Sequence, residues 1–573
     1  MTDSWRDSKA APSAAAHYIA AADARTAASL LLLRDTAAGF EVLMLRRAER
    51  HGDPRSGVAV FPGGVLDQRD AAAHAHCLGA DDPWASKRLG VAAGGLDYLV
   101  AAVRETFEEV GLLLAEGRFD IDALEGWRRG LQAGRIGIAD LCSAHGLQLD
   151  LRGVAYHSHW LTPPGVHKRF DTRFFIAMAP AGQVAEADLG EALEVMWLAP
   201  HDALDAKRGL KLLPVTQRTL QDLGRQPSAA AAIAAARDRS HVPLMMPRRA
   251  VAASGPRAVL PDERAYAEVA RLDPEGRGDV ACEITAGHAV RLSPRIVRIT
   301  APNPGVMTGP GTNTYLVSDV AQAAGWTVID PGPVSEPHLQ AVLDAVARLG
   351  RHIERILVTH THRDHSPGAA ALARATGAPV WGRIAAHPEG QDASFTPSHQ
   401  PAHGERIALG TSTTLRVVHT PGHASNHLCY LLEEERTLFT GDHVMQGSTV
   451  VINPPDGDMA AYLEALRALL DEPLDWLAPG HGFLVAEPHA VLRALVTHRL
   501  KREAKVLAAL RSLTGSSLEA SSGVAPLDAL LRCVYDDVPA ALHPVARRSL
   551  LAHLLKLEAD GAARREGDDW SAA

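Results

Sequence analysis

The sequence predicts a multidomain protein in which two α/β domains precede a smaller, mainly helical unit. The chain has 573 residues, and a prior of about 100 to 200 residues per domain gives three or four domains. Two separate regions contain short apolar runs that end in Gly or Pro turns, as strands do at a sheet edge. The region after residue 496 changes to helical patterns with one short charged hairpin.

The composition is that of an ordinary globular protein. Apolar residues make up 46% of the chain, so each domain can bury a core. The net charge of −9 gives no global hint of nucleic-acid binding, so any RNA affinity must come from a local patch. No apolar run reaches 18 residues and the start lacks the order of a secretory signal, so we expect a cytoplasmic protein without a membrane partner. Five widely spaced cysteines argue against a disulfide framework or a zinc ribbon.

The pattern along the chain suggests five segments. Residues 1–26 are rich in Ala and Ser and are expected to be a mobile tail. The first α/β domain is expected at 27–245, and its Ala229–Ala236 run is expected to be a packing helix. Residues 246–293 contain four prolines and are expected to be a linker with short extended pieces. The second α/β domain follows at 294–496, and the helical unit occupies 497–573.

The second α/β domain contains seven side chains of the kinds that bind metals. They are His360, His362, Asp364, His365, His423, Asp442 and His481, and each follows an apolar run with strand character. Strands that end in Gly or Pro turns bring such residues to one edge of a sheet. Imidazole nitrogen and carboxylate oxygen are ligands that Zn²⁺ accepts, and seven ligands are too many for one tetrahedral ion. The sequence therefore predicts a site for two metal ions.

The motif His360-Thr-His362-Arg-Asp364-His365 resembles the HxHxDH signature of the metallo-β-lactamase superfamily. The resemblance implies an αββα sandwich, a first metal on His360, His362 and His423, a second on Asp364, His365 and His481, and Asp442 as the bridge. It also implies that Asp330 lies beneath the site and orients ligands. Zinc is the expected metal, with manganese or iron as alternatives. Asp364 is expected to orient a water whose pKa the two cations lower, and His427 is either a cleft residue or a packed histidine.

Within that superfamily, residues 294–573 resemble the beta-lactamase-like protein 2 group through Ala301-Pro-Asn-Pro-Gly305, Gly311-Thr-Asn-Thr-Tyr315 and the helical extension. This resemblance implies a winged-helix-like unit, a homodimer and cleavage of single-stranded RNA. Phosphate contacts are expected through Arg499, Lys501, Arg502 and Lys505, with a solvated helical cap as the alternative. Glyoxalase II-like thioesterases carry the same metal ligands, so the metal site alone does not separate a phosphodiester from a thioester.

The first α/β domain contains an acidic helix. Its apolar residues recur at helical spacing, while Glu105, Glu108 and Glu109 gather on another face. Like charges three or four positions apart repel each other in a helix, and a hard divalent cation removes that repulsion. Arg104 is spaced to pair with Glu108. The three glutamates are therefore predicted ligands of Mg²⁺ or Mn²⁺, with Glu105 a candidate to activate water; the alternative is a solvated acidic helix.

The stretches Val60–Asp67 and Ala101–Gly111 resemble the two parts of a Nudix box, which implies hydrolysis of nucleoside diphosphates linked to another group. An insertion from Ala71 to about Leu96 splits the box, and Asp70 stands where the family has a glutamate. The split, together with Arg169–Phe175, resembles the Nudix subgroup that acts on coenzyme A and its esters.

The combined interpretation is a bifunctional metallohydrolase. The second α/β domain is expected to cleave single-stranded RNA, slightly favoured over an acyl thioester, and the Nudix-like domain a nucleotide or coenzyme A diphosphate. Two hypotheses of other classes stay open. In one, Asp70 does not support catalysis and the Nudix-like domain only binds a nucleotide; in the other, the chain is a nucleic-acid scaffold that acts through its C-terminal helices.

Overall fold

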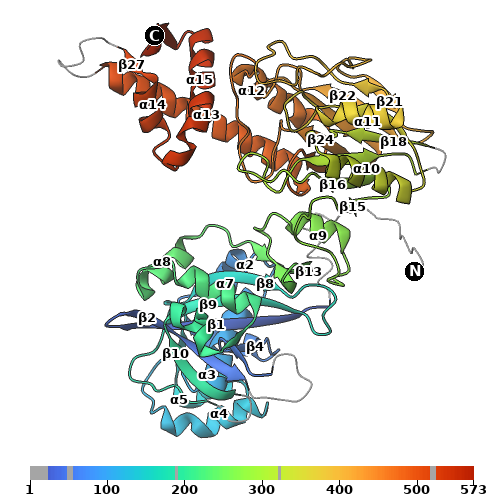
Figure 1. The fold of residues 1–573 in the computed structure, drawn as a ribbon. Helices are drawn as coiled ribbons and strands as arrows, with labels where there is room; N and C mark the ends of the chain where they lie inside the picture. The colour runs from blue at the N-terminus through green and yellow to red at the C-terminus, as the bar shows by residue number, and fades with distance from the viewer. Residues whose placement is uncertain (1–22, 48–55, 188–191, 321–323, 516–523) are drawn as a thin grey trace. The chain divides into compact units, whose positions relative to one another are not determined.

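The computed structural model describes residues 23–47, 56–187, 192–320, 324–515 and 524–573, and the statements below concern these residues. The chain forms two compact units (Figure 1). The N-terminal unit comprises the described residues up to Pro261 together with Asp273–Asp279, and the C-terminal unit comprises Asp262–Leu272 and Val280–Ala573. Of the segment expected as a mobile tail, residues 1–22 lie outside the described residues, and the first strand begins at Arg25.

The N-terminal unit is built on a mixed nine-stranded sheet. Its strands are β1 (Arg25–Thr36), β2 (Gly39–Arg47), β3 (Val58–Val60), β4 (Gly63–Val65), β8 (Ala155–Leu161), β9 (Phe170–Met178), β10 (Ala192–Leu198), β11 (Lys211–Leu212) and β12 (Leu244–Met245). The main order is β11-β3-β2-β1-β9-β8-β12, with β10 beside β2 and β4 beside β1. Strand β1 pairs with β9 in parallel and with β2 and β4 in antiparallel fashion.

Helices cover both faces of this sheet. Leu30 and Leu32 of β1 pack in one core with α3 (Gly95–Val110). Leu31 and Leu33 pack in the opposite core with α7 (Pro214–Leu223) and α8 (Ala229–Asp238). Because both faces are buried, β1 is a continuous apolar run rather than an alternating one. The Ala-rich packing helix predicted near residue 230 is confirmed as α8.

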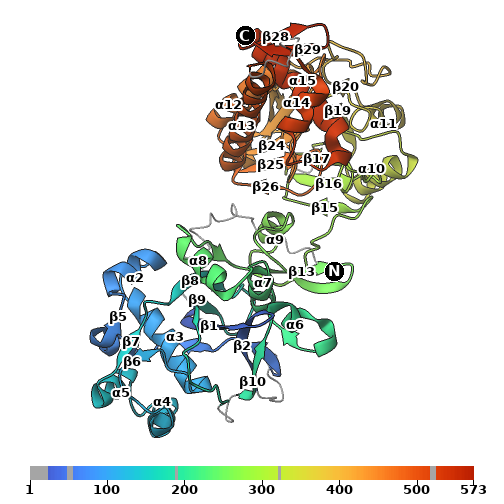
Figure 2. The ribbon, with the colours of Figure 1, turned by 90° about the vertical axis from the view of Figure 1, so that its left-hand side faces the viewer.

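The insertion that splits the Nudix-like motif is an ordered part of the N-terminal unit. It contains the 3-10 helix η1 (Asp70–His76), β5 (Cys77–Leu78) and α2 (Asp82–Leu89). Strand β5 joins a small sheet with β7 (Gln148–Asp150) and β6 (Ala115–Glu116). Helices α4 (Glu125–Gln132) and α5 (Ile138–His145) complete this side of the unit (Figure 2).

The segment expected as a linker contains regular structure. Strands β13 (Arg248–Ala252) and β14 (Gly255–Val259) pair as a hairpin, in line with the predicted extended pieces. The seven-residue helix α9 (Tyr266–Leu272) belongs to the C-terminal unit and was not predicted from the sequence. Pro261 and Pro274 flank it closely, and a helix this short shows little periodicity.

The C-terminal unit contains two six-stranded sheets. The first has the order β15 (Ala289–Arg291), β16 (Ile296–Thr300), β17 (Asn313–Val317), β18 (Trp326–Ile329), β19 (Ile353–Leu357) and β20 (Val380–Trp381). The second has the order β21 (Arg406–Ala408), β22 (Thr414–His419), β23 (Leu428–Leu432), β24 (Thr437–Gly441), β25 (Trp476–Pro479) and β26 (Val485–Ala486).

The two sheets and their helices form the expected αββα sandwich. Helices α10 (Glu336–Arg348) and α11 (Gly368–Thr376) share a core with the first sheet, and α12 (Met459–Ala468) shares one with the second. The sheets meet through side chains such as Tyr315 and Phe439, whose ring centres lie 5.0 Å apart.

The chain ends in a small unit of helices and a hairpin, as the resemblance implied. It contains α13 (Pro488–Gly515), β27 (Ala525–Pro526), α14 (Leu527–Val534), α15 (His543–Ala559), β28 (Ala563–Glu566) and β29 (Asp569–Ala572). Figure 1 shows α13 running from the sandwich to the helices α14 and α15. Its Leu492 packs in the sandwich core, whereas Val506 and Leu510 pack in the terminal core. Every helix among the described residues is too short or too polar to span a bilayer.

Candidate metal centre and carboxylate pocket

The seven predicted metal ligands of the C-terminal unit come together at the carboxyl ends of four strands. His360, His362, Asp364 and His365 follow β19. His423 follows β22, Asp442 follows β24 and His481 follows β25. They form two adjacent groups, one of His360, His362 and His423 and one of Asp364, His365, Asp442 and His481.

In the three-histidine group, three ring nitrogens converge. Nδ1 of His362 lies 3.0 Å from Nε2 of His360 and 3.0 Å from Nε2 of His423. The other ring nitrogens of His360 and His423 bind oxygen atoms outside the group, Thr359 Oγ1 at 3.0 Å and the Val451 carbonyl at 2.8 Å. Those hydrogen bonds place the protons on the outward nitrogens, so the lone pairs face one another, an arrangement that a cation between them stabilises.

Asp442 faces both groups. Its Oδ1 lies 3.3 Å from His365 Nε2 and 3.2 Å from His481 Nε2, and its Oδ2 lies 3.8 Å from His423 Nε2. Asp364 closes the second group with Oδ2 at 3.4 Å from His481 Nε2. One carboxylate that presents an oxygen to each group has the geometry of a bridging ligand.

The chemistry of the second group also fits a cation. Asp442 Oδ1, His365 Nε2 and His481 Nε2 are buried, and although each nitrogen lies within 3.3 Å of the oxygen, these atoms make no hydrogen bond. Buried polar atoms in native proteins nearly always have partners, and an unsatisfied one costs about 1–3 kcal/mol. Nitrogen and carboxylate ligands in this number suit two divalent ions of the zinc type.

Contacts behind the ligands fix the orientation of their rings. His365 Nδ1 donates to Asp330 Oδ2 at 2.9 Å, and His481 Nδ1 donates to the Gly311 carbonyl at 3.1 Å. Asp330 also accepts from the backbone and the hydroxyl of Thr359 at 2.7 and 2.8 Å. Asp330 therefore lies beneath the centre, where the sequence resemblance puts it. The carbonyls of Gly311 and Val451 were not predicted, because a backbone oxygen leaves no residue-type signal in the sequence.

The two groups differ in their electrostatics. Burial, and then the charges of neighbouring histidines, hold the pKa of His360 well below its usual value. Burial likewise lowers the pKa of His362 to about 3. For His481, burial opposes the charged form, but Asp442 and Asp364 outweigh it and raise its pKa to about 9. Burial thus keeps His360 and His362 neutral, whereas in the second group the carboxylates of Asp364 and Asp442 favour the charged forms of His365 and His481.

His427 is a packed histidine, which resolves the two interpretations left open by the sequence. Its side chain is fully buried, and burial holds its pKa well below the usual value. Its Nδ1 lies 2.9 Å from Thr420 Oγ1, and its Nε2 accepts from the backbone N–H of Asp442 at 3.2 Å. His427 therefore supports the backbone of Asp442, the predicted bridging residue, from within the core.

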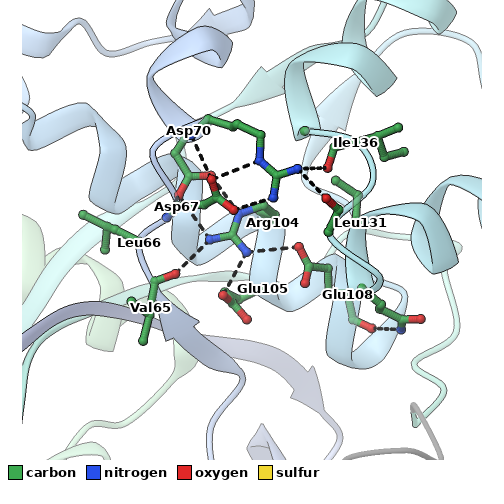
Figure 3. Close-up of a pocket in the computed structure, with 13 residues that line it drawn as sticks. Val65, Leu66, Asp67, Asp70, Arg104, Glu105, Glu108, Leu131 and Ile136 are labelled. Carbon is green, nitrogen blue, oxygen red and sulfur yellow. Dashed lines mark hydrogen bonds and ion pairs between the residues drawn. The ribbon is translucent and has the colours of Figure 1, made fainter.

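The N-terminal unit contains a pocket with a volume of about 370 Å³. Figure 3 shows Glu105 and Glu108 of α3 on one side of it and Leu131 and Ile136 on another. Arg104 lies between the carboxylates. Its Nη1 donates to Glu105 at 2.8 Å and to Glu108 at 3.0 Å, as the sequence spacing predicted for Glu108.

Asp70, which stands where the Nudix family has a glutamate, lies in this pocket. It is 1% exposed and accepts from Arg104 Nε at 2.7 Å and Nη2 at 3.1 Å. The insertion after Asp70 therefore leaves the aspartate next to the arginine of α3. Gly64 approaches the same site so closely that a Cβ there would lie 2.4 Å from the Glu105 carboxyl carbon, so a side chain at this position would displace the Glu105 carboxylate.

The three predicted glutamate ligands do not all line the pocket. Glu105 and Glu108 do, whereas Glu109 accepts a hydrogen bond from the Gly63 backbone at 2.9 Å and is not among the lining residues. Burial raises the pKa of Glu105 to about 7, because the charge of Arg104 is shared with Asp70 and Glu108 and only partly offsets it. A carboxyl that titrates near neutrality is suited to accept a proton from water.

The Arg169–Phe175 stretch, which carried part of the coenzyme A resemblance, lies outside this pocket. Asp171 and Arg173 are buried in β9, and Asp171 Oδ1 lies 2.5 Å from His159 Nε2 and 3.3 Å from Arg173 Nη1. These contacts make it part of the polar core of the sheet.

The four cations expected to contact phosphate are mostly engaged within the chain. Arg499 is 3% exposed and donates to the Val450 carbonyl. Arg502 pairs with Asp537 at 2.7 and 3.0 Å, and Lys505 pairs with Asp536. Lys501 alone of the four is exposed. The expectation of a four-residue phosphate-binding surface on α13 is therefore wrong for Arg499, whose cationic group is enclosed, and weakened for the two paired residues.

Comparison with known families agrees with this architecture. The metallo-beta-lactamase superfamily matches residues 307–481, which contain all seven residues of the centre. The beta-lactamase associated winged helix domain matches residues 527–570, and the NUDT19 Nudix domain matches residues 80–214.

Individual proteins match each half. The atrochrysone carboxyl ACP thioesterase of Aspergillus chevalieri is 31% identical over 278 residues, which are 47% of this chain and 83% of that protein. The beta-lactamase-like protein 2 homolog of Drosophila melanogaster is 30% identical over 282 residues, 48% of this chain and 91% of that protein. The crystal structure of a Nudix hydrolase from Alicyclobacillus acidocaldarius is 28% identical, covers 37% of this chain and 96% of that one, and has a TM-score of 0.33.

From the N-terminus, the matched regions fall in the Nudix-like unit, the sandwich and the terminal unit, which is the order of these parts in the structure. The chain belongs to the metallo-β-lactamase superfamily, and it is a hydrolase that also carries an N-terminal Nudix domain and a C-terminal winged helix domain.

Proposed function

We propose that the C-terminal unit hydrolyses an acyl thioester at a centre for two divalent metal ions, and that the Nudix domain hydrolyses a nucleotide or coenzyme A diphosphate. The observation that carries the proposal is Asp442, whose two oxygens face the two ligand groups at 3.2 and 3.8 Å. His360, His362 and His423 would hold one ion, and Asp364, His365 and His481 the other, with zinc as the expected metal.

Two bound cations would lower the pKa of a shared water and polarise the carbonyl under attack. The chain's own residues then have defined tasks. Asp364 is the partly exposed member of its group, with 27% of its side chain accessible. Its carboxylate orients the attacking water. Asp330 holds the ring of His365, and His427 holds the backbone of Asp442, so both ligands are in place before substrate binds.

Three observations support a thioester. A thiol leaving group has a pKa of about 8.5 and departs as a thiolate without a proton donor, and the enclosed neutral His427 supplies none. Arg499, Arg502 and Lys505 are engaged within the chain. A relative with 31% identity is an acyl carrier protein thioesterase by name. The coenzyme A type of split Nudix box would place both halves on related substrates.

Single-stranded RNA remains the second candidate. It is favoured by the likeness to the beta-lactamase-like protein 2 homolog, of which this chain covers 91%, since the sequence resemblance to that group implied an endoribonuclease. Any strand-binding surface would have to use cations other than the buried Arg499.

In the Nudix domain, the glutamates of α3 would hold a divalent ion such as Mg²⁺, which would supply positive charge for the substrate diphosphate. Glu105 and Glu108 are the ligands that line the pocket, and Glu105 is the group that accepts a proton from the attacking water. Arg104 fixes both glutamates and Asp70 at once. Glu109, the third predicted metal ligand, accepts a hydrogen bond from the Gly63 backbone and would have to reach the ion from there.

The test uses the purified full-length protein with zinc or manganese, a panel of acyl-CoA thioesters and labelled single-stranded RNA. We expect thioester hydrolysis that is lost in His362→Ala, and intact RNA. RNA cleavage that is lost in the same variant, without thioester hydrolysis, would establish the nuclease instead. Glu105→Gln should abolish diphosphate hydrolysis and leave the thioesterase unchanged; diphosphate binding without hydrolysis by the unaltered protein would make the Nudix domain a binding module.

A further inference from the structure

A short strap of three residues, Val450–Val451–Ile452, connects the metal centre to the C-terminal helices. Val451 accepts the hydrogen bond of the ligand His423 at 2.8 Å. The residues on either side of Val451 are held from outside the sandwich. Arg499 of α13 donates to the carbonyl of Val450, and Ser549 of α15 accepts from the backbone N–H of Ile452 at 3.4 Å.

This arrangement sets His423 apart from the other histidines whose supporting contacts are known. His360, His365 and His481 take theirs from Thr359, Asp330 and Gly311, which all belong to the sandwich. The hydrogen-bond partner of His423 lies in a loop between β24 and α12, and that loop is fixed by helices of the C-terminal extension.

The contacts that fix the strap are buried. Arg499 is 3% exposed and Ser549 is 6% exposed, so water does not compete for the strap's polar groups. The guanidinium of Arg499 also lies 5.4 Å from the centre of the Tyr462 ring, and the Tyr462 hydroxyl donates to the carbonyl of His443 at 3.0 Å. Arg499 therefore packs on Tyr462, which in turn holds the backbone of His443, the residue after Asp442.

The helices that carry Arg499 and Ser549 are continuous with the terminal core. In α13, Leu492 packs in the sandwich core while Val506 and Leu510 pack in the terminal core. In α15, Ala552 packs in the sandwich core while Leu550 and Leu554 pack in the terminal core. A displacement of the winged helix domain would therefore be transmitted by these two helices to the strap.

We propose that Arg499 and Ser549 are positioning residues for His423, so that the winged helix domain sets the metal affinity of the three-histidine site. The proposal rests on the metal centre proposed above and is independent of whether the substrate is a thioester or RNA. Contacts behind a metal ligand act by holding its ring and its tautomer, and their removal weakens metal binding by about 10- to 100-fold.

The test is a zinc titration of the metal-free full-length protein against a competing chelator. His423→Ala and His481→Ala first identify which binding step belongs to each site. We expect Arg499→Gln to weaken the step that His423→Ala removes by about tenfold, the lower end of the range, because Arg499 acts through a carbonyl one residue away. The step that His481→Ala removes should stay unchanged. Ser549→Ala should weaken the same step less, and Arg499→Lys should recover part of the loss.

Arg502→Gln is the matched control. Arg502 lies on the same helix, and its partners, Asp537 and the Val534 carbonyl, belong to the terminal unit. We expect this variant to bind both ions normally. Thermal unfolding of each variant shows that it is folded before titration.

The outcomes separate the two proposals. Equal weakening of both binding steps by Arg499→Gln, or no change in a folded Arg499→Gln protein, would overturn the positioning role. Should Arg499→Gln fail to fold, Ser549→Ala decides by the same criterion: weakening confined to the His423 step supports the role, and unchanged affinities overturn it. An unaltered protein that binds no divalent ion would overturn the metal centre itself.

Discussion

Arg104 and Asp70, 34 positions apart in the chain, form a two-point ion pair with distances of 2.7 and 3.1 Å. Both residues are buried, and the same guanidinium holds Glu105 and Glu108. The insertion between them folds as η1, β5 and α2 and returns the chain to the start of α3. The two parts of the motif are thus separated in the sequence but lie together in the structure.

Replacement of Asp70 should destabilise the Nudix domain more than replacement of the exposed Asp67 does. Asp70→Ala leaves a buried guanidinium without its main partner, and removal of one member of a buried pair costs about 3–5 kcal/mol. We expect the free energy of unfolding to fall by that amount in urea unfolding of the full chain, with hydrogen exchange of the α3 peptide reporting on the Nudix domain. Diphosphate hydrolysis should be lost in parallel.

Asp67→Ala is the control for this prediction. Asp67 pairs with Arg69 at the surface, where the two side chains are 33% and 44% exposed. Such a pair contributes about 0–1 kcal/mol. An Asp70→Ala protein as stable as Asp67→Ala would contradict the structural role given to Asp70.

Glu105 should make the metal-free Nudix domain less stable as the pH rises. Its pKa is about 7 in the folded protein against a usual 4.5, so folding favours the protonated form. The stability from this group is fully present below pH 4.5 and is lost as the pH rises through 7. A difference of about 2.5 units corresponds to about 3 kcal/mol.

Two measurements check this prediction. Glu105→Gln should remove the pH dependence and stabilise the metal-free protein above pH 7. Added Mg²⁺ should stabilise the unaltered protein, because the ion offsets the buried negative charge, and should stabilise Glu105→Gln much less. Parallel stability curves for the two proteins from pH 5 to 8, without metal, would rule out the proposed burial effect.

Glu268 of α9 should be essential to the C-terminal unit although it lies in the segment expected as a linker. It accepts from Arg298 at 2.6 and 2.9 Å and from the Leu484 backbone at 2.9 Å, three residues after the predicted ligand His481. Both side chains are buried. Glu268→Ala should therefore destabilise the C-terminal unit by about 3–5 kcal/mol, measured by hydrogen exchange of peptides from β16 and β25.

Asp475→Ala tests whether this effect depends on burial. Asp475 pairs with Arg436, and the two side chains are 40% and 50% exposed. We expect a change of about 1 kcal/mol or less. A Glu268→Ala protein with the stability of Asp475→Ala would show that the buried contacts of Glu268 do not stabilise the C-terminal unit.

The sequence predicted the parts of the molecule that local patterns encode. The HxHxDH run is compact, and the other three metal-site residues each stand where an apolar run meets a turn, so strand ends could be recognised and brought to one edge. Contacts between distant residues were harder to predict. The pairing of Arg502 with Asp537 joins positions 35 apart, and nothing local to α13 indicates it.

Backbone partners and short helices also escaped prediction. The carbonyl of Val451 has no residue-type requirement, so its role behind His423 is visible only in three dimensions. Helix α9 spans seven residues between two prolines, too few for a clear period. Glu109 shows a further limit: three glutamates on one helix face share a direction, but only the packing decides which of them reaches the Gly63 backbone.

His338 should make the C-terminal unit sensitive to acid. It is 1% exposed on α10, and its Nε2 donates to the hydroxyl of Thr314 at 2.7 Å, since that hydroxyl itself donates to the Asp330 carbonyl. Nδ1 is buried without a partner. Burial lowers the pKa of His338 to about 4 from a usual 6.5. The stability from the neutral ring is fully present above pH 6.5 and is lost as the pH falls towards 4. The difference of about 2.5 units corresponds to about 3 kcal/mol.

His338→Gln keeps a donor for Thr314 but does not titrate, so the unaltered protein should lose about 3 kcal/mol more than this variant between pH 7 and 4. Urea unfolding of both proteins without metal, with hydrogen exchange of the α10 peptide, measures that difference, and identical pH slopes would show that His338 does not cause the sensitivity.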